Sequence, residues 1–288
     1  MLYLIIGLKN VYQISGVLMS NLTRTKLFMF GMDNTITREQ HHFEWNLEGA
    51  LKDLMNFGDI AIITSSSMDE IRNQLGKFLD YSSIRYHLHL LPCNGTQWFS
   101  PPPYHDREIL LRAKSKMEDH LGPKSFQKLM KIIVDLQSVA TDDENIRMKG
   151  SFVNNRRGLL HWTPIGLDAS AGDREKFALY DQQSGFRKGL LSTFRKSLSL
   201  TDFGDNTIEV RLGGSGFDIF PKGWDKTIAL NHFEDREVWF VGSDCEGDGN
   251  DRDIYLHCKD RAYVTTSPSA TVDVIYDIIG RLEKESGR

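Results

Sequence analysis

Three short apolar runs constrain the fold of this 288-residue chain more than any other feature. They lie at Leu27–Phe30, Ile60–Ile63 and Val238–Val241, and polar or small residues follow each of them. Apolar runs without polar alternation are typical of strands that are buried on both faces of a parallel sheet. Apolar residues at helical spacing lie between the first two runs, at 45–54, and again after the second, at 69–75. Strand and helix therefore alternate, which predicts a right-handed α/β unit.

The middle of the chain has a different pattern. After Pro101-Pro102-Pro103, which must be extended, we expect helices at Glu108–Leu121 and Ser125–Gln137. Further strands are expected at 151–154, 158–163 and 207–212, and further helices at 173–181 and 185–199. These strands face a core on one side only, as in an α+β domain. The domains that we expect are an N-terminal extension at 1–19, an α/β core at 20–100 and 222–288, and an inserted α+β domain at 101–221.

Composition and charge exclude several classes of protein. The chain is 40% hydrophobic and 26% charged, as in ordinary soluble globular proteins, and its net charge of −4 does not favour nucleic acid or an anionic membrane surface as a partner. No segment approaches the roughly 20 apolar residues of a membrane span. The three cysteines, Cys93, Cys245 and Cys258, are widely spaced, so they predict neither a disulfide framework nor a zinc site. We expect a reduced, cytoplasmic location.

Polar turns follow the first two apolar runs directly. The turn at Gly31–Thr37 contains Asp33 and lies where an open α/β sheet places its site, at the carboxyl end of a buried strand. Its residue types also favour tight turns for purely local reasons. The second turn, Thr64–Ser67, offers hydroxyl and backbone N–H groups to a phosphate. The alternative is that Ser66 or Ser67 simply caps the next helix.

Two later segments also carry chemistry. In the segment Phe217–Lys226, Lys226 follows a turn and is suited to neutralise a phosphoryl group. The alternative is that it is solvated, as a lysine at a helix start usually is. The Gly-rich segment Gly242–Asp251 follows the third apolar run and is rich in carboxylates. Such oxygens suit magnesium, and the alternative is an acidic surface loop.

The order and spacing of these segments resemble the eukaryotic-type phosphomannomutases, a haloacid dehalogenase family with an inserted cap. The similarity extends over nearly the whole chain from about Lys26 onward, and Phe217–Lys226 and Thr163–Gly166 are its most specific parts. The matching stretches are Leu27–Thr37, Asp69–Gly76, Pro92–Gly95, Lys149–Gly166, Phe217–Lys226, Gly249–Asp253 and Tyr263–Pro268.

The resemblance implies a fold, an activity and partners. The fold is α/β, a Rossmann-like haloacid dehalogenase core with an inserted α+β cap domain. The activity is that of an isomerase which interconverts mannose 6-phosphate and mannose 1-phosphate through an aspartyl-phosphate and a hexose bisphosphate, and so supplies GDP-mannose for glycosylation. The implied cofactor is Mg²⁺, and the implied partners are hexose phosphates and a second copy of the chain, bound through the cap.

The resemblance also assigns roles to individual residues. Asp33 corresponds to the general acid/base, and Lys226 to the lysine beside the phosphoryl group. The positions that correspond to substrate and phosphate contacts are Thr64, Ser65, Ser66, Lys149, Arg156 and Asp218. The positions that correspond to the metal site are Asp33, through its carbonyl, Asp244, Asn250 and Asp251.

The sequence departs from the family pattern at positions that correspond to catalytic, metal-binding and substrate-binding residues. Gly31 stands at the position of the nucleophilic aspartate, and Ser243 at that of a magnesium carboxylate. Leu167 replaces a phosphate-binding arginine, Gly216 replaces a serine beside the sugar, and Lys149 replaces an arginine but keeps its charge. We therefore expect low or no mutase activity, unless Asp33 or Asp244 is recruited as the nucleophile. The alternative is a non-catalytic sugar-phosphate-binding protein or a dimer partner of an intact phosphomannomutase.

Overall fold

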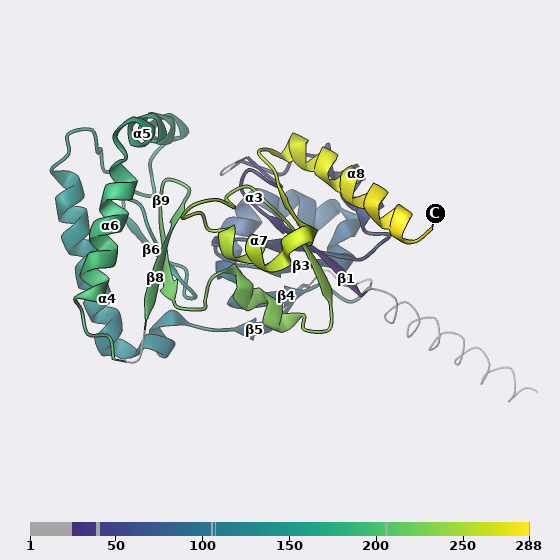
Figure 1. Cartoon of the computed structure of the whole chain (residues 1–288), viewed down its shortest axis with the longest axis horizontal. Helices are drawn as coiled ribbons and strands as arrows, with labels where there is room; N and C mark the ends of the chain where they lie inside the picture. Colours follow the sequence, from purple (N-terminus) through teal and green to yellow (C-terminus); the bar gives the residue numbers. More distant parts are fainter. Residues whose placement is uncertain (1–24, 39–40, 105, 107, 205–206, 288) are drawn as a thin grey trace, which may run out of the picture.

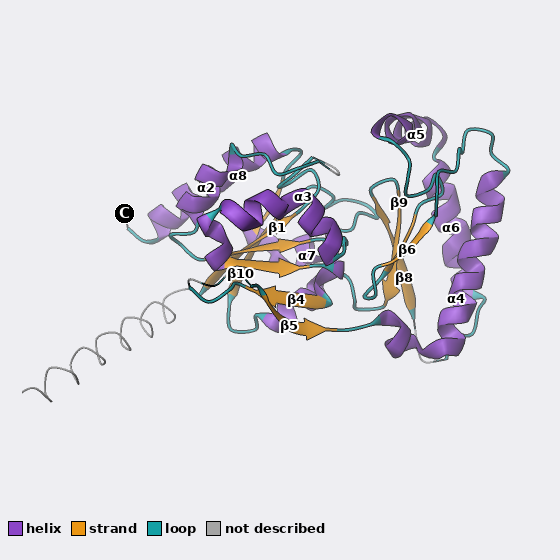
Figure 2. Cartoon of the chain, turned by 180° about the vertical axis from the view of Figure 1, so that it is seen from behind, coloured by secondary structure: helices purple, strands orange, loops and turns teal. Residues whose placement is uncertain are grey.

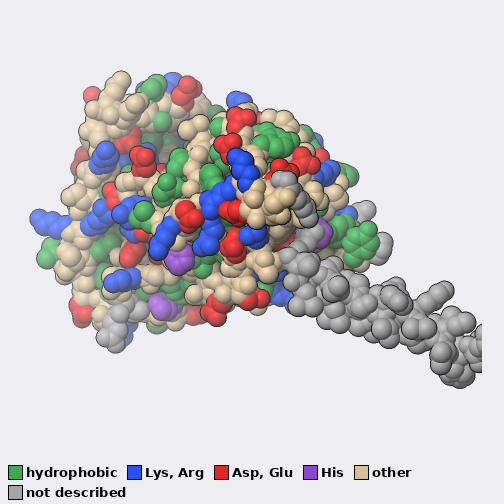
Figure 3. Space-filling view, turned by 45° about the vertical axis from the view of Figure 1, so that its right-hand side comes forward, with side chains coloured by type: hydrophobic (Ala, Val, Ile, Leu, Met, Phe, Trp, Pro, Cys, Tyr) green, Lys and Arg blue, Asp and Glu red, His purple; other side chains and the backbone are tan. Residues whose placement is uncertain are grey.

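A computed structural model describes residues 25–38, 41–104, 106, 108–204 and 207–287. The expected extension at residues 1–19 lies outside the described residues. Two domains, each built around its own sheet, lie side by side (Figure 1). On the face drawn in Figure 3, Lys and Arg side chains lie interspersed with Asp and Glu, so neither sign of charge dominates that face. None of the helices in the described part of the chain is long and apolar enough to cross a membrane.

The core domain contains a seven-stranded sheet with the order β11-β10-β1-β2-β3-β4-β5. Its strands are β1 (Lys26–Gly31), β2 (Asp59–Ile63), β3 (Leu88–Leu91), β4 (Gln97–Ser100), β5 (Leu110–Lys114), β10 (Glu237–Gly242) and β11 (Ala262–Val264). Phe30 pairs with Val241 on one side and Ile62 on the other, both in parallel. The three apolar runs are therefore neighbours in one parallel sheet, which confirms the prediction.

Helices cover both faces of this sheet (Figure 2). They are α2 (Leu47–Leu54), α3 (Met68–Tyr81), α7 (Arg252–Cys258) and α8 (Pro268–Glu285), with the 3₁₀ turns η1 (Ser83–His87), η2 (Cys93–Gly95), η3 (Lys226–His232) and η4 (Lys259–Arg261). Phe28 and Phe30 pack with residues of α2, α3 and α8, whereas Leu27 and Met29 pack with residues of α7 and η3. Successive side chains of a strand point to opposite faces, so burial on both faces explains why the β1 sequence is apolar without alternation.

The inserted domain has a four-stranded antiparallel sheet with the order β6-β7-β9-β8. Its elements are α4 (Met117–Thr141), β6 (Val153–Asn155), β7 (Leu160–Trp162), α5 (Ala171–Ser184), α6 (Phe186–Ser199), β8 (Ile208–Gly213) and β9 (Gly216–Pro221). The sheet lies between α4 and α6 on its outer side and the core domain on the other (Figure 2). Trp162 stacks on Phe217 at 4.8 Å between ring centroids and packs with Phe194 of α6. The neighbouring positions His161 and Asp218 therefore face the core domain.

The predicted start of the inserted domain is wrong in detail. Leu110–Lys114, placed in a helix by the sequence analysis, forms strand β5 and pairs with β4 at the edge of the core sheet. The helix begins only at Met117, and the chain leaves the core sheet after Lys114 instead of at Pro101. Pairing with β4 overrides the local helical spacing here. Within α4, Gly122 has a φ of 72° and breaks the helix before Pro123, because the residue before a proline is disfavoured in the α region.

Candidate active site

Two adjoining cavities lie between the carboxyl ends of the core strands and the inner face of the cap. The first has a volume of about 730 Å³ and the second about 340 Å³, and both are lined by Asp33 and Ser65. The other expected site residues at the first cavity are Thr64, Asp218, Lys226, Asp244, Asn250 and Asp251. Those at the second cavity are Ser66 and Arg156, with Leu167 in its wall. Lys149 is exposed and lines neither of these two cavities.

Gly31 ends strand β1 at the floor of the cleft. A Cβ atom added to it would lie 3.1 Å from Thr35 Oγ1 and 3.4 Å from Asp251 Oδ2. The Thr35 hydroxyl is buried and has no hydrogen-bond partner within the described residues. The position expected for a nucleophilic carboxylate is thus held by a residue without a side chain, beside a hydroxyl that lacks an acceptor.

Asp251 and Lys226 form a buried ion pair beside Gly31. Their side chains are 5% and 7% exposed, and Lys226 Nζ lies 2.5 Å from Asp251 Oδ1. The other carboxylate oxygen of Asp251 accepts hydrogen bonds from the backbone N–H groups of Ser243 and Asp244, both at 3.1 Å. Both oxygens of Asp251 are therefore engaged, and the positive charge of Lys226 is neutralised within the protein.

The residues present do not fit a magnesium ion. Mg²⁺ requires near-octahedral oxygen ligands, usually including one or two free carboxylates. The Asp33 carbonyl accepts a hydrogen bond from Ser243 Oγ at 3.0 Å, and Asp244 Oδ2 accepts one from the Asn250 backbone N–H at 3.1 Å. Burial raises the pKa of Asp244, and the nearby Asp251 adds to this. Within the described ranges, no three His, Cys, Asp or Glu side chains gather as a metal site.

The turn after β2 both caps a helix and faces the cleft. Ser67 is the N-cap of α3, where its hydroxyl accepts from the Glu70 backbone N–H and the Glu70 carboxylate accepts from the Ser67 backbone N–H. Thr64 Oγ1 accepts from the Ser66 backbone N–H at 3.1 Å. The helix cap is therefore Ser67 alone, and the hydroxyl-bearing residues before it line the cavities.

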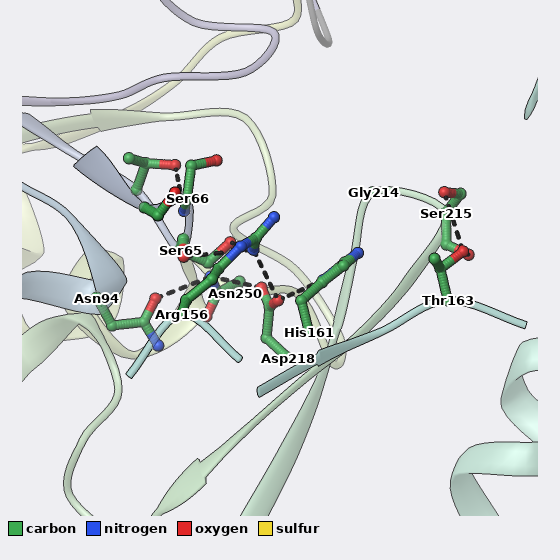
Figure 4. A network of polar contacts seen from close by, with 12 residues as sticks. Ser65, Ser66, Asn94, Arg156, His161, Thr163, Gly214, Ser215, Asp218 and Asn250 are labelled. Carbon is green, nitrogen blue, oxygen red and sulfur yellow. Dashed lines mark hydrogen bonds and ion pairs between the residues drawn. The ribbon is translucent and has the colours of Figure 1, made fainter. Parts of the chain in front are cut away.

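A network of charged and polar side chains joins the cap to the core (Figure 4). Arg156, in the turn between β6 and β7, lies 2.6 Å from Glu70 Oε1 of the core and 3.6 Å from Asp218 Oδ1 of the cap. Asp218 Oδ2 accepts from Asn250 Nδ2 at 3.2 Å, and the same Nδ2 donates to Asn94 Oδ1 at 3.2 Å. Arg156 and Asp218 thus contact residues of the core and not only each other.

His161 is a site residue that the sequence analysis missed. It pairs with Asp218 in the register of β7 and β9, and its Nδ1 lies 2.8 Å from Asp218 Oδ1. Burial raises the pKa of Asp218, but the hydrogen bond and charge of His161, with the charge of Arg156, hold it below its ordinary value. The far end of the imidazole points away from Asp218 towards Gly214, and His161 lines the second cavity (Figure 4). Its pairing with Asp218 depends on strand register, which local sequence does not reveal.

Comparisons with known proteins agree with this architecture. A family model described as eukaryotic phosphomannomutase matches residues 47–281. The phosphomannomutase of Dendrobium officinale is 29% identical over 252 residues, which are 86% of this chain and 91% of that protein. The phosphomannomutase of Arabidopsis thaliana is 29% identical over 248 residues, 85% of this chain and 92% of the relative.

The fold is also similar to that of a solved structure. An N-terminally truncated, IMP-bound IMP-nucleotidase from Plasmodium falciparum aligns with a TM-score of 0.63 at 12% identity, covering 88% of this chain and 68% of the nucleotidase. At this identity the likeness concerns the fold alone. It agrees with the sheet topology, and the expected Rossmann-like haloacid dehalogenase core with an α+β cap is confirmed.

Proposed function

Because this chain belongs to the eukaryotic phosphomannomutase family, we propose that it is a member with low or no mutase activity that still binds hexose phosphates. The observation that carries the proposal is Gly31 at the carboxyl end of β1. The family reaction requires a carboxylate oxygen that attacks phosphorus, forms an acyl-phosphate bond and releases the sugar hydroxyl. Gly31 has no atom that performs this step.

Neighbouring carboxylates are poor replacements. Both oxygens of Asp251 are engaged, by Lys226 and by two backbone N–H groups. One carboxylate oxygen of Asp244 accepts the Asn250 backbone N–H, and the like charge of Asp251 lies nearby. Asp33 lies two residues beyond Gly31, a position suited to moving protons to and from a sugar oxygen. These contacts support a site that retains acid/base groups and lacks the attacking group.

The metal requirement weakens the case for turnover further. Both oxygens of Asp251 and one oxygen of Asp244 are already engaged within the protein, and Ser243 donates to the Asp33 carbonyl. When bound, Mg²⁺ would neutralise phosphoryl charge, but the residues present do not assemble a site for it. We therefore expect weak magnesium binding.

Ligand binding is supported by groups that do not depend on a nucleophile. Ser65 and Ser66 offer hydroxyls at the start of α3, where backbone N–H groups and the helix dipole favour an anion. His161 and Asp218 offer a hydrogen-bonding pair for sugar hydroxyls at the cap side of the cleft. The three cysteines are free and buried, which is compatible with a cytoplasmic location.

A second candidate function is pairing through the cap, either with another copy of this chain or with an intact phosphomannomutase. Helix α4 lies on the outer side of the cap (Figure 2), and its residues Val134 and Val139 are 52% and 55% exposed. Single exposed apolar side chains are ordinary on a protein surface, so this candidate rests on the pairing through the cap that the family resemblance implies. Sedimentation of the chain alone, and with an intact relative, tests this candidate directly.

The main proposal is tested by incubating the purified chain with mannose 1-phosphate, Mg²⁺ and a hexose bisphosphate. We expect no mannose 6-phosphate and no phosphoryl group bound covalently to the protein, while calorimetry detects binding of mannose 1-phosphate. Robust turnover that Asp33→Asn abolishes would refute the proposal and make Asp33 or a neighbour the nucleophile. Absence of both turnover and binding would leave the cap-mediated function.

A further inference from the structure

A partly buried ion pair links the cap to the core at the second cavity. Arg156 NH2 donates to Glu70 Oε1 at 2.6 Å, and the two side chains are 7% and 31% exposed. Arg156 belongs to the cap turn between β6 and β7, whereas Glu70 belongs to the first turn of α3 in the core. Both residues line the second cavity.

Both terminal nitrogens of the Arg156 guanidinium are engaged within the protein. Its NH1 group donates to the Ser65 carbonyl at 3.3 Å and lies 3.6 Å from Asp218 Oδ1. Only Nε is buried without an acceptor among the residues described. A planar guanidinium at a cleft wall is the group best suited to bind a phosphate with two parallel hydrogen bonds. Here a carboxylate of the chain takes that place.

We propose that Glu70 determines ligand specificity by occupying Arg156 in place of a second phosphate, so that the cleft accepts hexose monophosphates and rejects hexose bisphosphates. This inference rests on the proposed binding function and adds which phosphate esters the site takes. A bisphosphate would have to displace Glu70 and place a dianion beside both Glu70 and Asp218, whereas a monophosphate leaves the pair intact.

Glu70 is held firmly in this place. Its second carboxylate oxygen accepts from the Ser67 backbone N–H at 2.6 Å as part of the N-terminal cap of α3. Burial raises the pKa of Glu70, but the charge and hydrogen bond of Arg156 and the bonds from Ser67 bring it below the ordinary value. Glu70 is therefore ionised at neutral pH. Its carboxylate pairs with the Arg156 guanidinium and repels a second anion.

The first cavity offers no obvious alternative for a second phosphate. Carboxylates outnumber basic side chains in its wall, and Lys226 is paired with Asp251. Lys188, which is exposed at the start of α6, lines this cavity and makes no ion pair in the described part of the chain. Together with the Ser65 hydroxyl it provides for one phosphate group.

The decisive variant is Glu70→Gln, because the glutamine oxygen keeps the hydrogen bond from the Ser67 N–H, while the charge and the acceptor that hold Arg156 are removed. Asp69→Asn is the matched control, since Asp69 lies in the same helical turn and does not pair with Arg156. The dissociation constants of mannose 6-phosphate and mannose 1,6-bisphosphate are measured by calorimetry for each protein. We expect the wild type to bind the monophosphate more tightly than the bisphosphate, and Glu70→Gln to shift the ratio of the two dissociation constants towards the bisphosphate by about tenfold or more.

Two results would overturn the inference. One is a wild type that already prefers the bisphosphate by tenfold, with the preference lost in Arg156→Gln. The other is a Glu70→Gln ratio equal to that of the wild type and of Asp69→Asn. A titration with inorganic phosphate distinguishes a failure of this inference from a failure of the proposed function. Its readout is the NMR signal of the Arg156 Nε–H group. If no hexose ester binds any variant, the proposed function fails, and a phosphate-induced shift in Glu70→Gln alone still supports the inference, whereas no shift refutes it.

Discussion

Replacing Gly31 by Asp tests how far the site has lost its chemistry. The new Cβ lies 3.1 Å from Thr35 Oγ1 and 3.4 Å from Asp251 Oδ2, so the carboxylate gains a hydroxyl donor and a negatively charged neighbour. Burying an ionised carboxylate costs several kcal/mol, and a hydrogen bond to a charged group returns about 1.5–3 kcal/mol. We expect Gly31→Asp to lower the free energy of unfolding by about 1–3 kcal/mol when Mg²⁺ is absent.

Thermal unfolding with and without Mg²⁺ measures the consequence. A ligand at about ten times its Kd adds about 1.4 kcal/mol to the free energy of unfolding, which raises Tm by about 3–5 °C for a protein of this size. We expect this rise for Gly31→Asp and almost none for the wild type. A rise of several degrees in the wild type would show that Asp33, Asp244 or Asp251 rebuilds the metal site.

In the mutase assay, the same variant tests whether position 31 alone limits activity or whether several positions do. Gly31→Asp alone is expected to restore little activity, because Ser243 and Leu167 leave the metal and the distal phosphate without their ligands. Adding Ser243→Asp and Leu167→Arg should recover far more than the sum of the single changes, since catalytic groups act as a unit. If Gly31→Asp alone equals the triple variant, the site is otherwise intact and our reasoning is wrong.

Three further predictions concern stability. Lys226→Met leaves the buried Asp251 carboxylate unpaired and should cost about 3–5 kcal/mol in urea unfolding; a loss under 1 kcal/mol would contradict a buried pair. Gly158→Ala places a Cβ 1.9 Å from the Thr96 hydroxyl of the core and should cost about 1–3 kcal/mol, whereas Gly172→Ala, whose Cβ would approach Ser170 Oγ only to 4.0 Å, should not destabilise the protein. Glu70 has a lowered pKa in the folded state, so its contribution is present above the ordinary value of 4.5 and is lost as pH falls through the lower, folded value. The urea midpoints of the wild type and of Glu70→Gln should therefore differ at neutral pH and become equal at acid pH. A difference that persists at acid pH would refute this.

The sequence predicted those parts of the fold that depend on local pattern. The runs at Leu27–Phe30 and Val238–Val241 are buried on both faces of the sheet, and for this reason their residues are apolar without alternation. Leu110–Lys114 was assigned wrongly because its burial is partial, and because its strand character comes from pairing with Gln97–Ser100, which local spacing does not record.

The site residues likewise divide into those that local sequence predicts and those that depend on long-range contacts. Asp33, Thr64 and Asp251 converge because parallel strands bring their carboxyl ends to one edge of the sheet, which sequence order reveals. The contacts of Arg156 with Glu70, 86 positions away, and of His161 with Asp218, 57 positions away, depend on how the cap sits on the core and on strand register. No local pattern encodes either contact.

The charged and polar groups of the cleft are paired with one another inside the protein. A buried charge without a partner costs several kcal/mol, so a cleft built for a metal and phosphates would be strained without them. Here Asp251 is satisfied by Lys226, Arg156 by Glu70, and the Asp33 carbonyl by Ser243 Oγ. Each of these contacts occupies a group that a ligand or cation would otherwise use. On the proposed function, turnover would require these internal pairs to break as well as a carboxylate at position 31, and we expect that a single substitution at the end of β1 does not achieve both.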